Sequence, residues 1–133
     1  MLRGARGPVK SISIRELREE FDSTDVVVVN VLAPPAFEKI RIKGSISMPR
    51  MELEAGRWRE LDRSKKIVVH CSSYECGASK AAAEFLEAKG YDVFAYEGGV
   101  KEWAEADLPM EGTVSPSQYL IDRYGRPRPP SPS

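Results

Sequence analysis

Cysteine and histidine are scarce in this sequence, and long apolar runs are missing from it. The 133 residues include two cysteines and one histidine. Two cysteines close together, at positions 71 and 76, cannot supply the disulfide framework of a small secreted domain, so we expect a reducing, cytoplasmic location. No run is long enough to span a bilayer, and the basic first eight residues lack the apolar core of a secretion signal. These absences argue against a secreted or membrane-spanning protein.

An excess of charge of either sign is also missing. Twenty basic side chains balance twenty acidic ones, so the net charge favours neither nucleic acid nor an anionic membrane as a partner. A hydrophobic content of 41% and a charged content of 30% are typical of a soluble globular chain, and the length suits one domain with its own core. The oligomeric state stays open between monomer and homodimer.

Composition divides the chain into three parts. We expect a flexible N-terminus over residues 1–8, a folded domain over residues 9–112 and a C-terminal extension over residues 113–133. The extension contains one predicted short helix after Ser115-Pro116. From Gly125 it becomes a proline-rich tail that cannot form a helix or a central strand. That tail is either frayed or an arm that packs on its own domain or on a partner subunit.

Strand-like and helix-like segments alternate through the domain. Apolar runs predict strands at 26–29 and 67–69, and a further short strand over 91–96. Helical patterns lie between the predicted strands, and the first begins with the capping-box spacing Ser13-x-x-Glu16. This alternation predicts an α/β domain with a largely parallel central sheet and helices on both faces.

The most informative stretch runs from Ile67 to Ala83. It reads as a buried strand, a loop of small residues and the start of a helix near Ala78, with Cys71 where the strand ends. Unpaired N–H groups and the helix dipole favour an anion at this position, so we expect a lowered pKa for Cys71 and a nucleophilic thiolate. The alternative is a small buried thiol that only fills the core.

Several segments, in the right order, resemble the rhodanese-like domain, a sulfurtransferase module related in fold to one class of cysteine phosphatases. The last of them carries a Gly-Gly-x-x-x-Trp signature. The matching segments are 26–31 with Phe37-Glu38, 42–49, 67–71, 81–91, and Tyr96-Glu97-Gly98-Gly99-Val100-Lys101-Glu102-Trp103 followed by Leu108-Pro109. Together they cover roughly Val9 to Met110. The resemblance implies a three-layer α/β domain.

The resemblance also implies sulfur transfer. In that family the loop cysteine takes sulfane sulfur from a small donor such as thiosulfate and passes it to a thiol, a protein acceptor or cyanide. Cys71 would then be the nucleophile and persulfide carrier, with no metal or other cofactor. The substrate-binding loop would consist of Ser72, Ser73, Tyr74, Glu75, Cys76 and Gly77, with Ser79 and Lys80 just beyond it.

The loop departs from the family's common pattern. It is longer than the compact loop usual in that family, and it contains no arginine. Glu75 would disfavour a doubly charged donor unless it points away, and Lys80 is the nearest cation in sequence to offset it. Asn30-Val31-Leu32 replaces a frequent Asp-Val-Arg, and Arg41 stands where histidine is frequent. These changes argue against thiosulfate as the natural donor more than they argue against the fold.

Cys76 places a second thiol in the same loop. It is a candidate resolving thiol that could attack an oxidised or sulfur-loaded Cys71 and form an internal disulfide. Alternatively, it is a small residue packed beneath the loop, since spacing does not fix side-chain directions. Zinc is not expected, because these two cysteines and His70 are one ligand short of a tetrahedral set. His70 either tunes the thiol or is simply packed.

Three functions therefore compete. The first is a sulfurtransferase, and the second is a binding or regulatory module that keeps the fold without turnover. The third is phosphatase or arsenate-reductase chemistry, which needs an arginine at the end of the loop to bind the oxyanion with two hydrogen bonds. Gly77 follows Cys76 at that point, so we expect no phosphatase activity.

Overall fold

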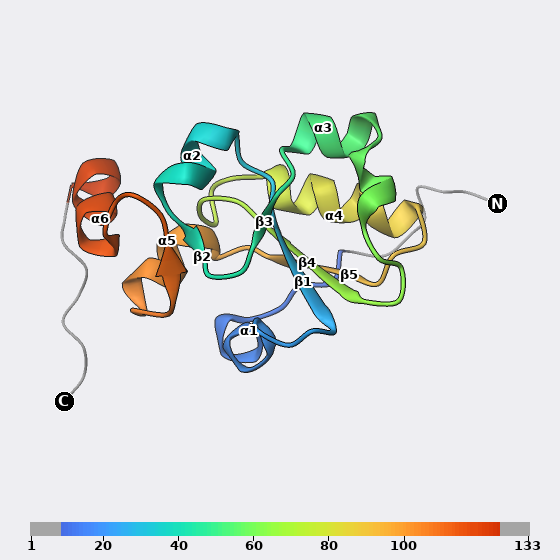
Figure 1. The fold of residues 1–133 in the computed structure, drawn as a ribbon, viewed down its shortest axis with the longest axis horizontal. Helices are drawn as coiled ribbons and strands as arrows, with labels where there is room; N and C mark the ends of the chain where they lie inside the picture. The colour runs from blue at the N-terminus through green and yellow to red at the C-terminus, as the bar shows by residue number, and fades with distance from the viewer. Residues whose placement is uncertain (1–8, 126–133) are drawn as a thin grey trace.

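A four-stranded parallel sheet forms the centre of the fold (Figure 1). The strands are β1 (Val26–Asn30), β3 (Ile46–Ser47), β4 (Lys66–His70) and β5 (Val93–Tyr96), and they lie in the order β3-β1-β4-β5. The computed structural model describes residues 9–125. The predicted flexible N-terminus and the proline-rich tail from residue 126 onward lie outside the described residues.

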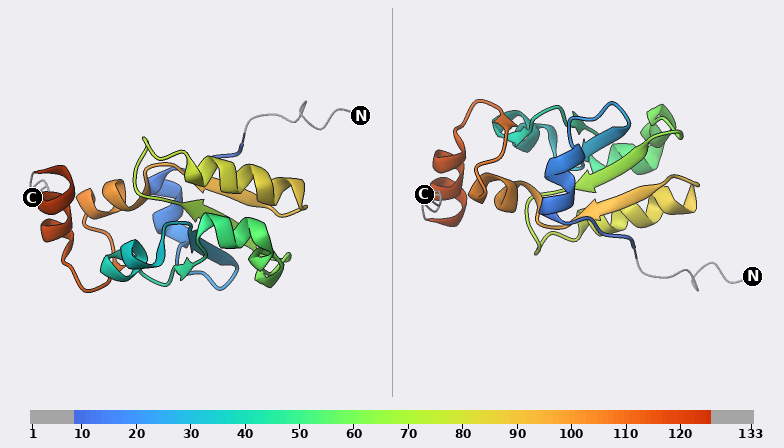
Figure 2. Two further views of the ribbon diagram at one scale, coloured as in Figure 1. Left: turned by 90° about the horizontal axis from the view of Figure 1, so that it is seen from above. Right: turned by 90° about the horizontal axis from the view of Figure 1, so that it is seen from below.

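Helices cover both faces of the sheet, as the alternating pattern predicts. Figure 2 shows α3 (Arg50–Ala55) and α4 (Ala78–Ala88) on one face and α1 (Ile14–Glu20) on the other. The two central strands carry the apolar runs 26–29 and 67–69 because each face of the sheet meets a separate core. Val29, Ile67 and Val69 pack with α3 and α4, whereas Val28 and Val68 pack with α1 and with Trp103 of α5 (Gly99–Glu105). The predicted three-layer α/β class is confirmed.

Local sequence signals begin the first helix where they were expected. The Ser13 hydroxyl accepts a hydrogen bond from the Glu16 N–H at 3.1 Å, and the Ser13 N–H donates to the Glu16 carboxylate at 3.0 Å. This reciprocal capping box satisfies two N–H groups that the helix leaves unpaired. The remaining elements between β1 and β4 are α2 (Pro34–Lys39), β2 (Arg41–Ile42) and the short 3₁₀ helix η2 (Arg57–Glu60). No helix within residues 9–125 is long and apolar enough to cross a bilayer.

The C-terminal segment returns to the domain and packs against it. Strand β6 (Met110–Glu111) pairs antiparallel with β2, and α6 (Pro116–Tyr124) follows. Ser115 caps α6 by accepting a hydrogen bond from the Gln118 N–H at 3.0 Å, which confirms the helix predicted after Ser115-Pro116. Leu120 of α6 is buried, and both figures place this helix beside α5 at one end of the molecule.

Candidate active site

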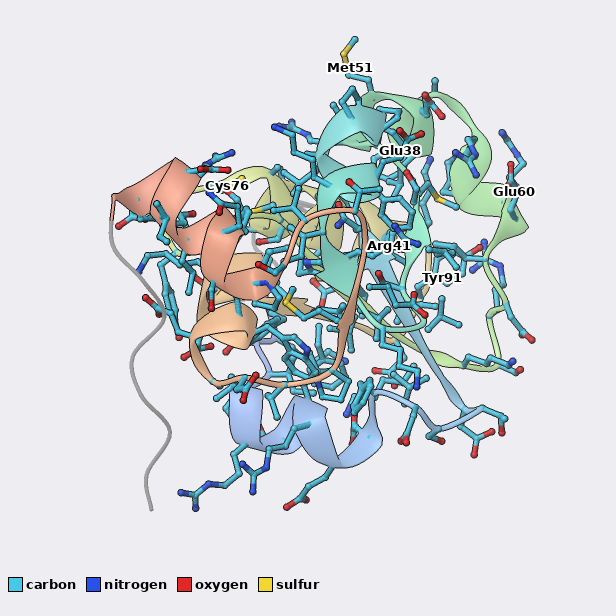
Figure 3. All side chains as sticks on the ribbon, turned by 60° about the vertical axis from the view of Figure 1, so that its left-hand side comes forward. Glu38, Arg41, Met51, Glu60, Cys76 and Tyr91 are labelled. Carbon is cyan, nitrogen blue, oxygen red and sulfur yellow. The ribbon has the colours of Figure 1, made fainter. Side chains whose placement is uncertain are left out.

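Cys71 is the first residue after β4, at the end of the sheet where ligands of parallel α/β folds usually bind. Its side chain is fully buried among residues of the α3–α4 core. The loop from Cys71 to Gly77 then leads into α4, with Cys76 on the loop (labelled in Figure 3). The structure thus places Cys71 at the strand-to-helix turn that the sequence predicts.

The start of α5 holds the Cys71 backbone in place. The Val100 N–H donates to the Cys71 carbonyl at 3.1 Å, and the Lys101 N–H donates to the Ser72 carbonyl at 2.8 Å. This approach requires glycine at position 99, where φ is +64° and a Cβ atom would lie 2.6 Å from the Cys71 carbonyl oxygen. The Gly-Gly-x-x-x-Trp signature therefore has a physical meaning here, because it brings α5 against the cysteine loop.

The pKa of Cys71 is raised, which corrects the lowered value expected from the helix terminus. Burial is the largest cause, because it penalises the thiolate, and a hydrogen bond with the Cys76 side chain acts in the same direction. The Cys71 thiol also donates to the Cys76 carbonyl at 3.3 Å. The N–H and hydroxyl of Ser79 at the start of α4 do favour the thiolate, as a helix N-terminus should, but they do not outweigh burial.

The pKa of Cys76 is shifted in the opposite direction, because it is lowered. Its burial opposes ionisation, but a hydrogen bond from the Cys71 thiol and further ones from Ala78 and Ser72 lower its pKa. The side chain is half-buried, whereas that of Cys71 is fully buried. The two thiols are both free and interact directly, and the more acidic of the pair is the one nearer to solvent.

Ser79 is the residue whose N–H and hydroxyl would stabilise a negative charge on the Cys71 sulfur. Its side chain is fully buried, and its hydroxyl has no partner of ordinary hydrogen-bond geometry within residues 9–125. Buried hydroxyls are normally paired, because an unpaired one has lost its bonds to water. The same hydroxyl favours ionisation of the Cys71 sulfur, so an anionic sulfur at this position would supply the missing acceptor.

The loop residues divide between two cavities. Ser72 lines a larger cavity of about 280 Å³. Ser73, Tyr74 and Glu75 line a smaller one of about 150 Å³ against α5. The Ser73 hydroxyl donates to the Glu75 carboxylate at 2.9 Å, and Tyr74 is 65% exposed. Glu75 thus lies on a different cavity from Ser72.

Gly77 and Lys80 lie at the edge of the site. Gly77 caps α4 with its backbone, and its carbonyl accepts from the Ala81 N–H at 3.2 Å. Lys80 is exposed on α4 and lines neither cavity. The structure therefore brings Ser72, Cys76 and Ser79 to Cys71, and does not bring Lys80 there.

His70 lies beneath the loop as a neutral, buried side chain. Its Nδ1 is 3.2 Å from the Cys71 carbonyl oxygen, and burial lowers its pKa to about 4. It pairs in register with Asn30 of β1, another buried polar residue. Within residues 9–125, no group of three His, Cys, Asp or Glu side chains is placed to hold a metal ion.

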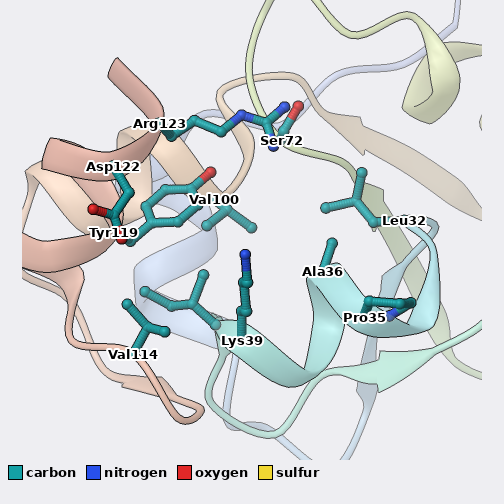
Figure 4. A pocket seen from close by; sticks show the side chains of 11 residues that line it. Leu32, Pro35, Ala36, Lys39, Ser72, Val100, Val114, Tyr119, Asp122 and Arg123 are labelled. Carbon is teal, nitrogen blue, oxygen red and sulfur yellow. The ribbon is translucent and has the colours of Figure 1, made fainter. Parts of the chain in front are cut away.

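Sequence reasoning missed one wall of the larger cavity. Lys39 of α2 and Tyr119, Asp122 and Arg123 of α6 line it together with Ser72 (Figure 4). These residues are distant in sequence from the cysteine loop, and no spacing motif joins them to it. The sequence signal for this wall was the predicted short helix, which has Tyr119, Leu120 and Tyr124 on one side.

The fold and the loop define an α/β domain with a cysteine at the carboxyl end of a central parallel strand. Residues 13–106 match the sequence profile of the rhodanese-like domain. This match covers more than half of the chain, and the protein belongs to the rhodanese-like domain family.

Curated relatives differ in how much of their length they share with this chain. The thiosulfate sulfurtransferase GlpE of Pseudoalteromonas translucida is 30% identical over 98 residues, which cover 73% of this chain and 90% of that protein. The HTH-type transcriptional regulator Rv0324 of Mycobacterium tuberculosis is 29% identical over 104 residues, 78% of this chain. The chain spans only 46% of the regulator's length.

Solved structures agree with the family assignment. A rhodanese-related protein from Thermoplasma volcanium superposes with a TM-score of 0.69 at 32% identity, covering 77% of this chain and 97% of that one. A protein from Bacillus halodurans reaches a TM-score of 0.74 at 23% identity, covering 79% and 78% of the two chains. The second likeness is one of fold alone.

Proposed function

We propose that this protein is a sulfurtransferase in which Cys71 carries sulfane sulfur as a persulfide. The observation that carries the proposal is the buried Ser79 hydroxyl. It has no hydrogen-bond partner of ordinary geometry among residues 9–125, and it favours an anionic sulfur on Cys71. The resemblance to a thiosulfate sulfurtransferase over most of that protein's length supports the same chemistry. The acceptor is a small thiol or a thiol of another protein.

The reaction has two displacement steps. The Cys71 thiolate attacks the outer sulfur of a sulfane donor such as thiosulfate, the sulfur–sulfur bond of the donor breaks, and sulfite leaves with the bonding electrons. An acceptor thiolate then attacks the outer sulfur of the Cys71 persulfide, and Cys71 leaves as the thiolate. The N–H and hydroxyl of Ser79 stabilise negative charge on sulfur in both steps, because charge-assisted hydrogen bonds are strong in a buried site.

A transfer assay tests this proposal. The protein is mixed with thiosulfate and either cyanide or a small thiol, and thiocyanate or sulfide is measured over time. We expect turnover by the native chain and none by Cys71→Ser. Ser79→Ala is expected to retain the fold and lose about tenfold in rate, the effect of removing one donor to a charged group. Turnover that survives Cys71→Ser would overturn the proposal.

A second candidate function is thiol redox chemistry between Cys71 and Cys76. The hydrogen bond from the Cys71 thiol to the Cys76 carbonyl, at 3.3 Å, brings the two residues together, and the lowered pKa of Cys76 favours this role. The Cys76 thiolate would attack the inner sulfur of a Cys71 persulfide, form a Cys71–Cys76 disulfide and release hydrosulfide. A dithiol reductant would then restore both thiols.

The two candidate functions predict different fates for a Cys71 persulfide when no acceptor is added. Loading with thiosulfate, followed by removal of excess donor, should release sulfide from the native chain if Cys76 resolves the persulfide. Cys76→Ser should keep the persulfide. Equal retention by both proteins would remove the redox role and leave sulfur transfer to an external thiol.

A further inference from the structure

His70 is a fully buried side chain that the proposed sulfur transfer does not use. It is the last residue of β4 and directly precedes Cys71. Its Nδ1 lies 3.2 Å from the Cys71 carbonyl oxygen, which can only accept a hydrogen bond, so Nδ1 carries a proton. Burial lowers the pKa of the ring to about 4, so the ring is neutral at pH 7 and Nε2 is an acceptor. This buried acceptor has no hydrogen-bond partner within residues 9–125.

Asn30 supplies the group that is complementary to this acceptor. It pairs in register with His70 from the neighbouring strand β1, and its side chain is also fully buried. The two side chains share one face of the sheet, because Val28 and Val68, two residues earlier on each strand, both pack with α1. The Leu32 N–H donates to the Asn30 Oδ1 at 2.9 Å, so the amide NH₂ is the unused end. That nitrogen also has no hydrogen-bond partner among the described residues.

The neighbouring amide favours a proton on one ring nitrogen of His70 over the other. A proton on Nε2 would place it beside a second N–H donor, and it would leave the Nδ1 lone pair against the Cys71 carbonyl oxygen. Both arrangements are unfavourable in a buried site, because water is not there to pair the polar groups. The tautomer with the proton on Nδ1 avoids both, since the carbonyl then has a donor and the Asn30 amide has an acceptor beside it.

Two donors from different elements then hold the Cys71 carbonyl. Nδ1 of His70 lies 3.2 Å from its oxygen, and the Val100 N–H of α5 donates to it at 3.1 Å. The peptide bond between Cys71 and Ser72 is trans, so its N–H points opposite to its C=O. The Ser72 N–H therefore points back into the cysteine loop, where it favours a negative charge on the Cys76 sulfur. Fixing the carbonyl thus fixes the direction of this N–H.

We propose that His70 is a positioning residue for sulfur transfer. Together with Asn30, it holds the Cys71–Ser72 peptide so that the Ser72 N–H stays directed at anionic sulfur in the cysteine loop. The outer sulfur of a Cys71 persulfide is such an anion. This inference rests on the proposed sulfurtransferase function and adds a residue that acts through the backbone without touching the substrate. Because its ring is neutral, His70 orients a peptide dipole and transfers no proton.

The tautomer of His70 tests the geometry without any substrate. Long-range ¹H–¹⁵N correlation spectra distinguish a protonated ring nitrogen from an unprotonated one, and the chain contains one histidine. We expect a protonated Nδ1 and an unprotonated Nε2 in the native protein at pH 7. Asn30→Asp replaces the donor beside Nε2 with an acceptor, so Nε2 should become protonated in that variant. A protonated Nε2 in the native protein, or an unprotonated one in folded Asn30→Asp, would overturn the proposal.

Matched variants separate positioning from stability. His70→Asn keeps an N–H donor near the place of Nδ1, whereas His70→Leu removes the donor and keeps a side chain of similar size. In His70→Leu the iodoacetamide pH profile of Cys76 should move up by at least about half a pH unit, because the Ser72 N–H is held less firmly. His70→Asn should keep the native profile, and urea unfolding confirms that both variants fold. A native profile in His70→Leu would show that His70 only fills space.

Sulfur loading completes the test. At saturating thiosulfate, the rate constant for persulfide formation should fall about fivefold in His70→Leu and less than about twofold in His70→Asn. If the tautomer and the Cys76 profile behave as predicted but no persulfide forms in any of the proteins, the peptide is held as proposed and the sulfurtransferase function fails. If His70→Leu forms the persulfide at the native rate, the positioning role alone fails.

Discussion

The two cysteines differ in environment although one loop carries both. Cys71 is fully buried and its pKa is raised, whereas Cys76 is nearer to solvent and its pKa is lowered. The position of Cys71 was predictable, because an apolar run followed by small residues marks the end of a buried strand. The direction of its pKa shift was not predictable, because it depends on burial and on the direction in which the Cys76 side chain points.

The first prediction concerns the order in which the two thiols react. Only the thiolate is alkylated readily, and a thiol ionises above its pKa. Iodoacetamide should therefore modify Cys76 before Cys71 as the pH is raised, which peptide mass spectrometry can follow. Cys76→Ala removes the hydrogen bond that raises the pKa of Cys71, so Cys71 should then react at lower pH. Modification of Cys71 first in the native chain would contradict this reading.

The second prediction concerns His70, the one histidine of the chain. Its pKa falls from 6.5 to about 4 in the folded protein because it is buried. Between these values the unfolded chain binds a proton that the folded protein does not, so acidification favours unfolding. Stability should fall as pH drops through this window, by an amount on the order of 3 kcal/mol for the full shift.

Urea unfolding between about pH 7 and pH 5 measures this effect, and His70→Gln supplies the control. The lowered pKa values of Glu16 and Asp62 contribute only near or below their ordinary values of 4.5 and 3.8. The variant should therefore lose most of the pH dependence in that range. An unchanged slope in the variant would show that another group is responsible.

At the scale of elements, the sequence predicts the parts that local signals specify. The capping box at Ser13 and the apolar runs of β1 and β4 each depend on a short pattern, and each forms as predicted. The contact between α5 and the cysteine loop depends on residues far apart in sequence. The glycine pair before Val100 marked a bend, but its role in seating α5 on Cys71 became visible only in three dimensions.

The third prediction follows from that contact. Gly99→Ala forces an alanine into a left-handed conformation and places its Cβ against the Cys71 carbonyl. We expect a loss of at least about 2 kcal/mol in unfolding free energy and impaired sulfur loading. Gly77→Ala is the control for stability, because φ is −84° and no atom lies within 4 Å of the new Cβ. Equal stability of the two variants in urea would contradict the steric explanation.

At the scale of the whole molecule, the C-terminal segment extends the domain beyond the region that matches the family profile. That profile ends at residue 106, yet β6 pairs with β2 and α6 packs beside α5. The division of the chain at residue 112 stays a prediction. The larger cavity could not be predicted from sequence, because its walls come from four segments that only the folded chain brings together.

The fourth prediction tests whether α6 folds with the rest. Leu120 is 2% exposed, so Leu120→Ala should reduce the unfolding free energy by about 2–4 kcal/mol and keep a single transition. Ile121→Ala, next to it and 44% exposed, is the matched control and should have little effect. Two separate transitions in the native chain would show that α6 does not fold with the domain.

The most direct test of the whole account is to locate the sulfur atom after loading. The native protein is treated with a sulfane donor, freed of excess reagent, digested and mapped by mass spectrometry, with Cys71→Ser and Cys76→Ser alongside. The account predicts one added sulfur on the Cys71 side of the loop in the native chain and in Cys76→Ser, removable by cyanide, and none in Cys71→Ser. Sulfur found on Cys76 and retained by Cys71→Ser would contradict it.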